Sequence, residues 1–482
     1  MTSDQPLHIG KRRELFIDHC LIERMENACL QIHHPQPENA AIKFDRPWEG
    51  AFSGYCTVLK HEEQFLLTYR GWPAADDHYA AVVCVALSSD GITFERPDLN
   101  LFDVMGQARN NVILTCEEDM YTHNFAPMLD TRPDVPDDQR FKALTRNYGL
   151  KFKREGTRTD PMGLFAFTSP DGIHWRKMAD QPVITQGLLD SQNVAFWSEH
   201  EECYVCYLRE STKSGDLYSE SVRTIARCTS DDFIHWSDPE LMDMGDTPPE
   251  HLYTNQTQPY FRAPHIYVAL PGRFMPGRQV LSDAQGKAFG VYTQPGGKHG
   301  YWEDCSDAVL LTSRGGTRYD RTFMEAFVRP GLDRRNWTSR CNYPACGILQ
   351  TGENEMSMYI ARHNAQDGKY LERLSMRLDG FASVSAGYSG GEMLTRPFVF
   401  SGDSLHINYS TSAAGQIQME LLDVDGQTVP GYSLDDCDTL IGDEIDRVVS
   451  WKSSTDVSLL ANQPVRLRAV LKDADLFSLQ FE

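Results

Sequence analysis

Apolar residues gather in short segments along the chain, either alternating with polar residues or running together, and most segments end near Gly, Asp, Asn or Ser. Segments of this length and pattern are typical of β-strands. The clearest ones lie at residues 54–59, 64–69, 81–87, 193–197, 204–208 and 223–228. We find no convincing long amphipathic helix between them. The pattern predicts an all-β protein.

A short motif recurs among these segments: Ser, any residue, Asp, then Gly or an aromatic residue, two further residues and an aromatic residue. The closest copies lie at 88–94, 169–175 and 230–236, and weaker ones at 313–319 and 377–381. Asp-Gly between apolar strands favours a tight turn, because Gly accepts a positive φ and Asp accepts hydrogen bonds from neighbouring amides. The copies therefore mark the same turn in successive repeats.

Each repeat holds about four strand segments, and the motif occurs five times, which predicts a five-bladed β-propeller at residues 36–384. Unrelated hairpins in a β-sandwich are the alternative. From residue 385 onward the pattern changes to alternating strands at 398–400, 405–409, 417–422, 465–471 and 476–481. We interpret residues 385–482 as a β-sandwich. Residues 1–35 are expected to supply strands that pack on the propeller, close its ring, or dock on the sandwich.

The net charge of the chain limits the partners that it is expected to bind. The 482 residues include 46 Lys and Arg against 68 Asp and Glu, for a net charge of −22. Such an acidic surface repels nucleic acid and anionic membranes, so a carbohydrate or another small molecule is the expected partner. The first residues lack the apolar segment of a signal peptide, and no apolar run is long enough to span a bilayer. We expect a soluble cytoplasmic protein, and homo-oligomerisation stays open.

The 12 cysteines are scattered, several of them in apolar strand segments, as reduced core residues usually are. Cys203 and Cys206 have the spacing of a CxxC pair, but in a strand that spacing directs the two sulfurs to opposite faces. No triad at metal-ligand spacing appears either. The sequence indicates no cofactor and no metal.

A Ser-x-Asp-Gly-x-x-Trp repeat at this spacing, followed by a sandwich, resembles the five-bladed glycoside hydrolases of the invertase/levanase and arabinanase/xylosidase families. Residues 14–18, 190–196 and 471–476 also resemble bacterial proteins described as glycosyl hydrolases. The likeness covers nearly the whole chain. The invertase motifs Trp-Met-Asn-Asp-Pro-Asn-Gly and Arg-Asp-Pro are absent. The resemblance implies a propeller that cleaves glycosidic bonds with carboxyl groups.

In arabinanase-like enzymes the base comes from the first blade, a supporting Asp from the third and the acid from the fourth. The residues before the matching strands of this chain include Glu49, Asp190 and Glu250, which are therefore the predicted catalytic residues. Glu250 follows two prolines beside aromatic residues, where partial desolvation favours a protonated acid. Asp190, among polar residues, is expected to orient the sugar or tune the acid. Glu49 is expected to be the base or nucleophile.

Other polar and aromatic residues near the same strand entries are expected to touch the sugar. Aromatic faces suit the C–H face of a sugar ring, and amides and basic groups suit its hydroxyls. These predicted substrate-binding residues are Trp48, His123, Asn124, Asn193, His251, Tyr253, Asn255, Trp337 and Arg340. Asp18 and Asp307 are rival carboxylates.

The function predicted from these residues is hydrolysis of a glycoside or oligosaccharide in the propeller channel. A phosphorylase on the same fold is one alternative, and it requires at least two basic residues in the pocket. Candidates for that role are Arg262, Arg273, Arg334 and Arg340. A non-catalytic glycan-binding propeller is the other alternative, and its mark is a pocket without an opposed pair of carboxyl groups.

Overall fold

The computed structural model describes residues 5–73, 80–116, 121–147, 162–213, 221–297 and 299–482. Their regular structure is almost entirely β-strand, which confirms the all-β class. The helices of this part are α2 (Asp283–Ala288) and three-residue 3-10 turns: η2 (Asp137–Gln139), η3 (Arg334–Asn336) and η4 (Ser458–Leu460). None of the described helices has the length and apolarity that crossing a bilayer requires.

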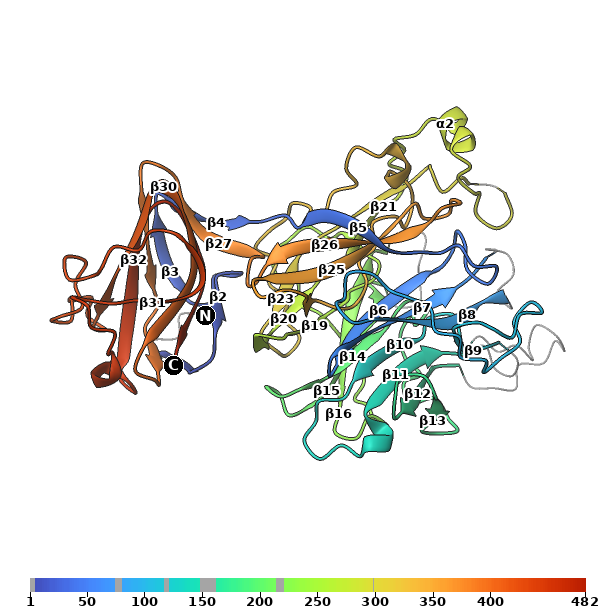
Figure 1. Cartoon of the computed structure of the whole chain (residues 1–482), viewed down its shortest axis with the longest axis horizontal. Coiled ribbons are helices and arrows are strands. Elements are labelled where there is room, and N and C mark those ends of the chain that lie inside the picture. The colour runs from blue at the N-terminus through green and yellow to red at the C-terminus, as the bar shows by residue number, and fades with distance from the viewer. Residues whose placement is uncertain (1–4, 74–79, 117–120, 148–161, 214–220, 298) are drawn as a thin grey trace. The chain divides into compact units, whose positions relative to one another are not determined.

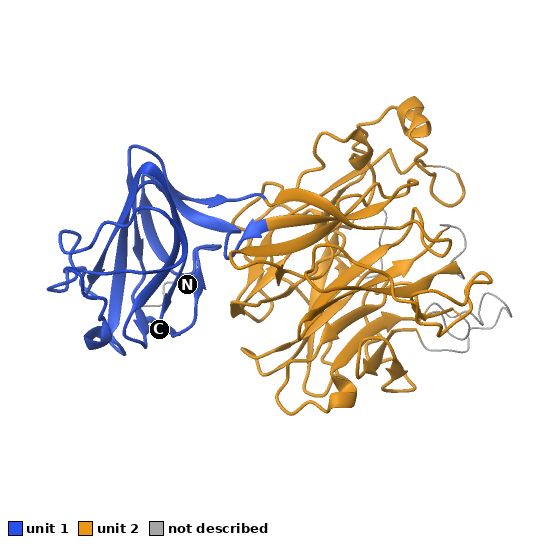
Figure 2. Cartoon of the chain, in the orientation of Figure 1, with its two compact units in different colours: residues 1–34, 376–482 blue, residues 35–375 orange. Residues whose placement is uncertain are grey.

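The chain divides into two compact units (Figure 2). Unit 1 combines residues 1–34 with residues 376–482, and unit 2 contains residues 35–375. Both ends of the chain therefore belong to the same unit.

Unit 2 begins with three antiparallel four-stranded sheets, each built from consecutive strands (Figure 1). Sheet 1 consists of β6 (Gly54–His61), β7 (Gln64–Gly71), β8 (Val82–Ser88) and β9 (Val112–Leu114). Sheet 2 consists of β10 (Ala126–Leu129), β11 (Phe141–Arg146), β12 (Leu164–Ser169) and β13 (Arg176–Lys177). Sheet 3 consists of β14 (Val194–Ser198), β15 (Cys203–Ser211), β16 (Arg223–Ser230) and β17 (Glu240–Leu241). The six clearest strand segments of the sequence lie in sheets 1 and 3.

The next sheet is split into two three-stranded halves. Sheet 4a consists of β18 (His251–Leu252), β21 (Gly272–Met275) and β22 (Cys305–Ala308). Sheet 4b consists of β19 (Gln258–Tyr260), β20 (Ala263–Ala269) and β23 (Leu311–Ser313). The chain passes from β18 into β19, from β20 into β21 and from β22 into β23 across only a few residues, so three passes of the chain build both halves.

The last sheet of unit 2 joins the two ends of that unit. Sheet 5 consists of β24 (Leu349–Gln350), β25 (Glu355–Arg362), β26 (Tyr370–Arg377) and β5 (Gln36–Lys43). β5 pairs antiparallel with β26, for example Ile42 with Leu371. The first strand of the unit thus supplies the outer strand of its last sheet (Figure 1).

The three closest copies of the sequence motif form one turn with the same hydrogen bonds. In the second copy the Ser169 hydroxyl accepts from the Gly172 amide (2.9 Å), and the Asp171 carboxylate accepts from the amides of Ile173 (2.9 Å) and His174 (2.8 Å). The first copy repeats this with Ser88 and Asp90, and the third with Ser230 and Asp232. Each turn follows the third strand of its sheet, as the motif predicts.

Clusters of buried apolar side chains join neighbouring sheets of unit 2. Four clusters link sheet 1 to 2, sheet 2 to 3, sheet 3 to 4b, and sheet 5 to 1. Val83 and Phe165 belong to the cluster between sheets 1 and 2, and Leu164 and Cys206 to the one between sheets 2 and 3. Phe196 and Tyr267 belong to the cluster between sheets 3 and 4b, and Tyr359 and Leu67 to the one between sheets 5 and 1. The packing therefore returns from the last sheet to the first.

Unit 1 contains a single ten-stranded hydrogen-bonded sheet with its own buried apolar core. Its longest members, β30 (Leu405–Leu422) and β32 (Pro464–Phe481), pair along most of their length. The other strands are β1 (Leu7–Gly10), β2 (Glu14–Leu15), β3 (Ile22–Glu26), β4 (Ala28–Ile32), β27 (Ala382–Ala386), β28 (Gly391–Thr395), β29 (Phe398–Phe400) and β31 (Asp443–Val448). The strands before residue 34 thus pair within unit 1, with C-terminal partners.

The separate strands expected at 405–409 and 417–422, and at 465–471 and 476–481, are in fact the halves of β30 and β32. Register shifts between Asn408 and Tyr409 and between Thr411 and Gln416 interrupt the pairing without ending the strand. The polar and small residues at these positions resemble a turn in sequence, which explains the difference.

Candidate active site

Unit 2 holds a pocket with a volume of about 250 Å³. Its walls come from strands of sheets 1, 3 and 5 and from the segments that connect the strands and sheets. Five lining residues are basic: Arg70, Arg209, Arg223, Arg340 and Lys369. The aromatic side chains of the lining are Phe52, Tyr55, Trp72, His123, Tyr253, Tyr301 and Tyr343. Of the lining residues that the structure describes, Asp190 is the one carboxylate.

Three non-glycine residues of the lining have left-handed backbone conformations. The φ angles are +49° at Tyr55, +52° at Gln256 and +59° at Arg340. Side chains with a Cβ rarely adopt this region, and each instance costs on the order of 1 kcal/mol or more. Such strain persists where the surrounding structure holds the residue in place, and functional sites often contain it. Three residues with strained backbone conformations thus lie together in the lining of this pocket.

Tyr253 lies between three guanidinium groups. Its ring centroid is 5.1 Å from the Arg223 guanidinium carbon, 5.4 Å from that of Arg340 and 5.8 Å from that of Arg209. Burial alone would raise the pKa of this phenol, but the positive charges of Arg340, Arg209 and Arg223 favour the phenolate and bring the pKa below its ordinary value. Tyr253 is therefore more readily ionised than an ordinary tyrosine.

Arg70 is held at the end of β7 by aromatic rings and carbonyl groups. Its guanidinium carbon lies 4.5 Å from the ring centroids of both Tyr55 and Trp72. It also donates hydrogen bonds to the carbonyl oxygens of Phe52 (2.9 Å) and His123 (3.1 Å). A cation stacked between two rings in this way is fixed in position.

Asp190 precedes β14 and is about half exposed, with 48% of its side-chain surface accessible. One of its carboxylate oxygens lies 3.8 Å from Nε2 of His123, whose ring packs against Trp72 with 5.0 Å between centroids. The carboxylate can therefore reach a ligand from the open side of the pocket.

Lys369 is buried in the pocket wall just before β26, and its Nζ donates to the Asn364 side-chain oxygen at 2.6 Å. Burial, together with the nearby charge of Arg70, lowers the pKa of Lys369 to about 7. The amine is thus partly neutral near physiological pH, and it can give or accept a proton there.

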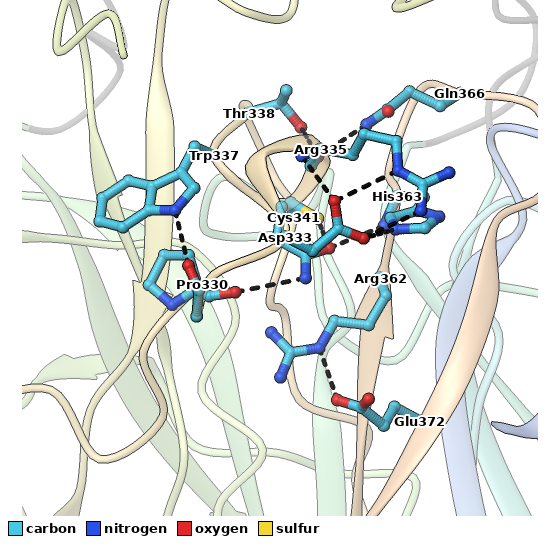
Figure 3. A network of polar contacts seen from close by, with 12 residues as sticks. Pro330, Asp333, Arg335, Trp337, Thr338, Cys341, Arg362, His363, Gln366 and Glu372 are labelled. Carbon is cyan, nitrogen blue, oxygen red and sulfur yellow. Dashed lines mark hydrogen bonds and ion pairs between the residues drawn. The ribbon is translucent and has the colours of Figure 1, made fainter. Parts of the chain in front are cut away.

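A polar network holds the segment that carries Arg340 (Figure 3). Asp333 caps η3 by accepting from the Arg335 amide (3.0 Å), and its other oxygen lies 2.7 Å from Nε2 of His363. Gln366 donates to the Arg335 carbonyl (2.8 Å) from the connection after β25. The strained backbone of Arg340 therefore follows a turn that is tied to sheet 5.

Glu49, the predicted base, is not a pocket residue. Its side chain is buried and binds Arg96 through both oxygens, at 2.8 and 2.7 Å, and accepts from the Tyr69 hydroxyl at 2.6 Å. This ion pair satisfies the charge of Glu49 beside sheet 1, outside the pocket, and the role of base stays a prediction.

Glu250, the predicted acid, is also absent from the pocket lining. It forms ion pairs with Arg321 and with Arg273 (3.0 Å). Arg273 also pairs with the rival Asp307 at 2.6 Å, and the rival Asp18 accepts from the Cys20 amide in unit 1. Only Asp190 of the predicted and rival carboxylates lines the pocket.

The predicted binding residues divide in a similar way. His123, Tyr253 and Arg340 line the pocket. The remaining ones, Trp48, Asn124, Asn193, His251, Asn255 and Trp337, do not. The three asparagines are buried and donate to backbone carbonyls, and the Trp48 indole donates to Asn111. His251 accepts from the Arg223 amide, and Trp337 donates to the Gly331 carbonyl, so all six side chains have partners outside this pocket.

Sequence reasoning missed Arg70, Arg209, Arg223 and Lys369, because it considered only the entries to the first strands. A signal was present: Arg70 and Arg209 each end an apolar strand segment, where a charge needs a specific reason. Among the described residues, no three or more His, Cys, Asp or Glu side chains are grouped as metal ligands would be.

No protein-family model and no curated protein matches the chain. Solved structures resemble it at low identity. A glycoside hydrolase has a TM-score of 0.48 and 9% identity, over 71% of this chain and 92% of its own. An N-acetylgalactosamine deacetylase from F. plautii, in complex with blood group B trisaccharide, has a TM-score of 0.45 and 12% identity, over 73% of this chain and 96% of its own. A family 43 arabinoxylan arabinofuranohydrolase from Bacillus subtilis has a TM-score of 0.39 and 12% identity, over 90% of this chain and 97% of its own. Glycoside hydrolases, the proteins that the sequence motifs resemble, are thus among the solved structures similar to this chain.

Proposed function

We propose that unit 2 is a five-bladed β-propeller in which sheets 4a and 4b together form the fourth blade. The apolar clusters that return from sheet 5 to sheet 1 support this arrangement, as does the completion of sheet 5 by β5. We further propose that unit 1 is a β-sandwich folded from the long strands β30 and β32. The pocket then lies where the blades meet, the usual place for a propeller's binding site.

We propose that the chain is a glycoside hydrolase that acts in this pocket. The observation that carries the proposal is the presence of Asp190 and a readily ionised Tyr253 in one pocket with aromatic walls. Cleavage of a glycosidic bond needs one group to donate a proton to the leaving oxygen and another to stabilise or attack the sugar cation. Two carboxyl groups usually do this, but a tyrosine replaces one of them in some glycosidases.

In this proposal Tyr253 attacks the anomeric carbon through its phenolate oxygen, and Asp190 donates its proton to the leaving oxygen. Asp190 then takes a proton from the water molecule that releases the sugar from Tyr253. The guanidinium groups around Tyr253 stabilise the phenolate before attack and after release. The aromatic rings give the sugar its stacking surface.

A screen of glycosides for released reducing sugar tests the proposal, with the full chain and with Asp190→Asn and Tyr253→Phe. Removing a general acid or a nucleophile should lower kcat by about 100-fold or more. Asp103→Asn, an exposed carboxylate of the same unit, is the matched control and should leave kcat unchanged. Full activity of Asp190→Asn on the substrate found would show that the assignment is wrong.

Phosphorolysis is the second candidate, because the basic lining residues would also suit inorganic phosphate. Of the four arginines proposed from the sequence for this role, Arg340 lines the pocket and Arg262, Arg273 and Arg334 do not. Release of a sugar 1-phosphate that depends on added phosphate distinguishes this reaction from hydrolysis.

A further inference from the structure

The pocket has a charge opposite to that of the chain as a whole. Among the described residues, five basic side chains and one carboxylate line it, whereas the whole chain has a net charge of −22. Basic residues are thus concentrated in the one place where a ligand is expected. A neutral sugar would not require this concentration.

Several of these charges have no carboxylate partner. Other arginines of unit 2, such as Arg96 and Arg273, form ion pairs at 2.6–3.0 Å with carboxylates. No ion pair joins Arg209, Arg223 or Arg340 to a carboxylate within the described residues. These three are the groups that surround Tyr253. Keeping like charges together in a partly buried wall is unfavourable unless an anion offsets it.

Two further polar atoms of the wall point to a ligand. Arg223 and Thr254 both line the pocket, and Nε of Arg223 and the hydroxyl of Thr254 are buried without a hydrogen-bond partner in the described part of the chain. Buried polar atoms are nearly always hydrogen-bonded in native proteins. The phenolate of Tyr253 offsets only part of this positive charge, because it carries one negative charge against three guanidinium groups.

We propose that the sugar cleaved in this pocket carries an anionic group, a carboxylate or a sulfate ester, that is bound by Arg209, Arg223 and Arg340. This inference rests on the proposed glycosidase function and names its substrate class. Guanidinium groups bind such oxygens through paired hydrogen bonds, and three of them can surround one anion. Arg70 is held by its rings and carbonyl partners, so it lines the pocket without joining this group.

Direct binding tests the anion site without requiring catalysis. Glucuronic acid, glucose 6-sulfate, glucose and inorganic phosphate are titrated into the full chain by calorimetry. At least one of the two anionic sugars should bind at least about tenfold more tightly than glucose. Comparing glucuronic acid with glucose 6-sulfate shows whether the site prefers a carboxylate or a sulfate ester. Equal binding of glucose would overturn the inference, and so would phosphate binding as tightly as the better anionic sugar.

Variants connect the binding to the three arginines. Arg340→Met and Arg223→Met should each weaken binding of the preferred anionic sugar by about tenfold and leave glucose binding nearly unchanged. Arg340→Lys should fall between wild type and Arg340→Met if the charge matters, and it covers the case in which the methionine variant misfolds. Arg109→Met, whose side chain is 82% exposed, is the matched control. Loss of glucose and anion binding to the same extent in folded variants would contradict the inference.

Activity separates the two proposals from each other. The glycosidase function and the anion site are both supported if the chain hydrolyses nitrophenyl glucuronides or sulfated glycosides but not the matched neutral glycosides. If neutral glycosides are hydrolysed as fast as anionic ones, and Asp190→Asn abolishes this activity, the glycosidase is supported and the anion site is overturned. Tight, arginine-dependent binding of an anionic sugar without cleavage of any of its glycosides supports the anion site and overturns the glycosidase.

Discussion

At the scale of single residues, Lys369 shows how the pocket affects the rest of the molecule. The lysine is only 4% exposed, and burial and Arg70 lower its pKa to about 7, whereas an unfolded chain has a lysine pKa near 10.4. Between these pH values the unfolded chain binds a proton that the folded chain does not. The free energy of unfolding should therefore rise with pH from about 7 to about 10 on account of this residue. Below pH 7 the folded chain holds a buried charge and is less stable.

We predict that Lys369→Met removes this rise. The contribution of the residue is on the order of a few kcal/mol, as expected for a pKa difference of about three units. Urea unfolding at several pH values from 6 to 10 measures it, and the slope rather than the absolute stability is compared, because the variant also loses the hydrogen bond to Asn364. Lys43→Met, an exposed lysine of β5, should keep the wild-type slope. The same slope in Lys369→Met and wild type would contradict the prediction.

At the scale of elements, the repeated turn is stabilised by its aspartate. In the third copy the Asp232 carboxylate accepts from the amides of Ile234 and His235, both at 2.8 Å, and from Nδ1 of His235. Although burial opposes it, these hydrogen bonds hold the pKa of Asp232 below its ordinary value. A lowered folded-state pKa means that this stabilisation is present above about pH 4 and is lost as pH falls further.

Asp232→Ala should therefore lower the free energy of unfolding at pH 7 by about 1–2 kcal/mol. The difference from wild type should shrink as pH falls below about 4. Chemical unfolding at pH 7 and pH 3 measures both effects. The neighbouring Asp231 is exposed and accepts no hydrogen bond from any described residue, so Asp231→Ala provides the control. A destabilisation that is equal at the two pH values would argue against a role for the carboxylate.

The bounds of β-strands could be predicted from the sequence where buried and exposed side chains alternate, but not where a strand bends. β6 and β7 begin at the positions that the sequence indicates, because apolar side chains there face a packed core. The bends of β30 could not be predicted, since Ser410, Thr411 and Gly415 suit a turn as well as an irregular strand. Asp190 was predicted from its position before a strand, and it lines the pocket, while its catalytic role stays a proposal. The ion pair of Glu49 could not be predicted, because its partner Arg96 is 47 residues away.

At the scale of the whole molecule, all 12 cysteines are free thiols. Cys206 and Cys228 are opposite each other on β15 and β16, and both are buried. Stability should therefore not depend on disulfides. We predict the same Tm with and without a thiol reductant. A fall in Tm of about 5 °C or more on reduction would reveal a stabilising disulfide and contradict the prediction, and mass spectrometry of the alkylated chain would locate it.

Because unit 1 is built from both ends of the chain, its first strands cannot pair until translation is nearly finished. β4 pairs with β27, and His33 hydrogen-bonds Ser383 across 350 positions. At a translation rate of about 5–20 residues per second, the first strands wait roughly 20–70 s on the ribosome for their partners. Unpaired strands attract other chains during such a delay, and charges on them discourage this. β3 carries three exposed charged side chains, Glu23, Arg24 and Glu26, which are of the kind that discourages such pairing.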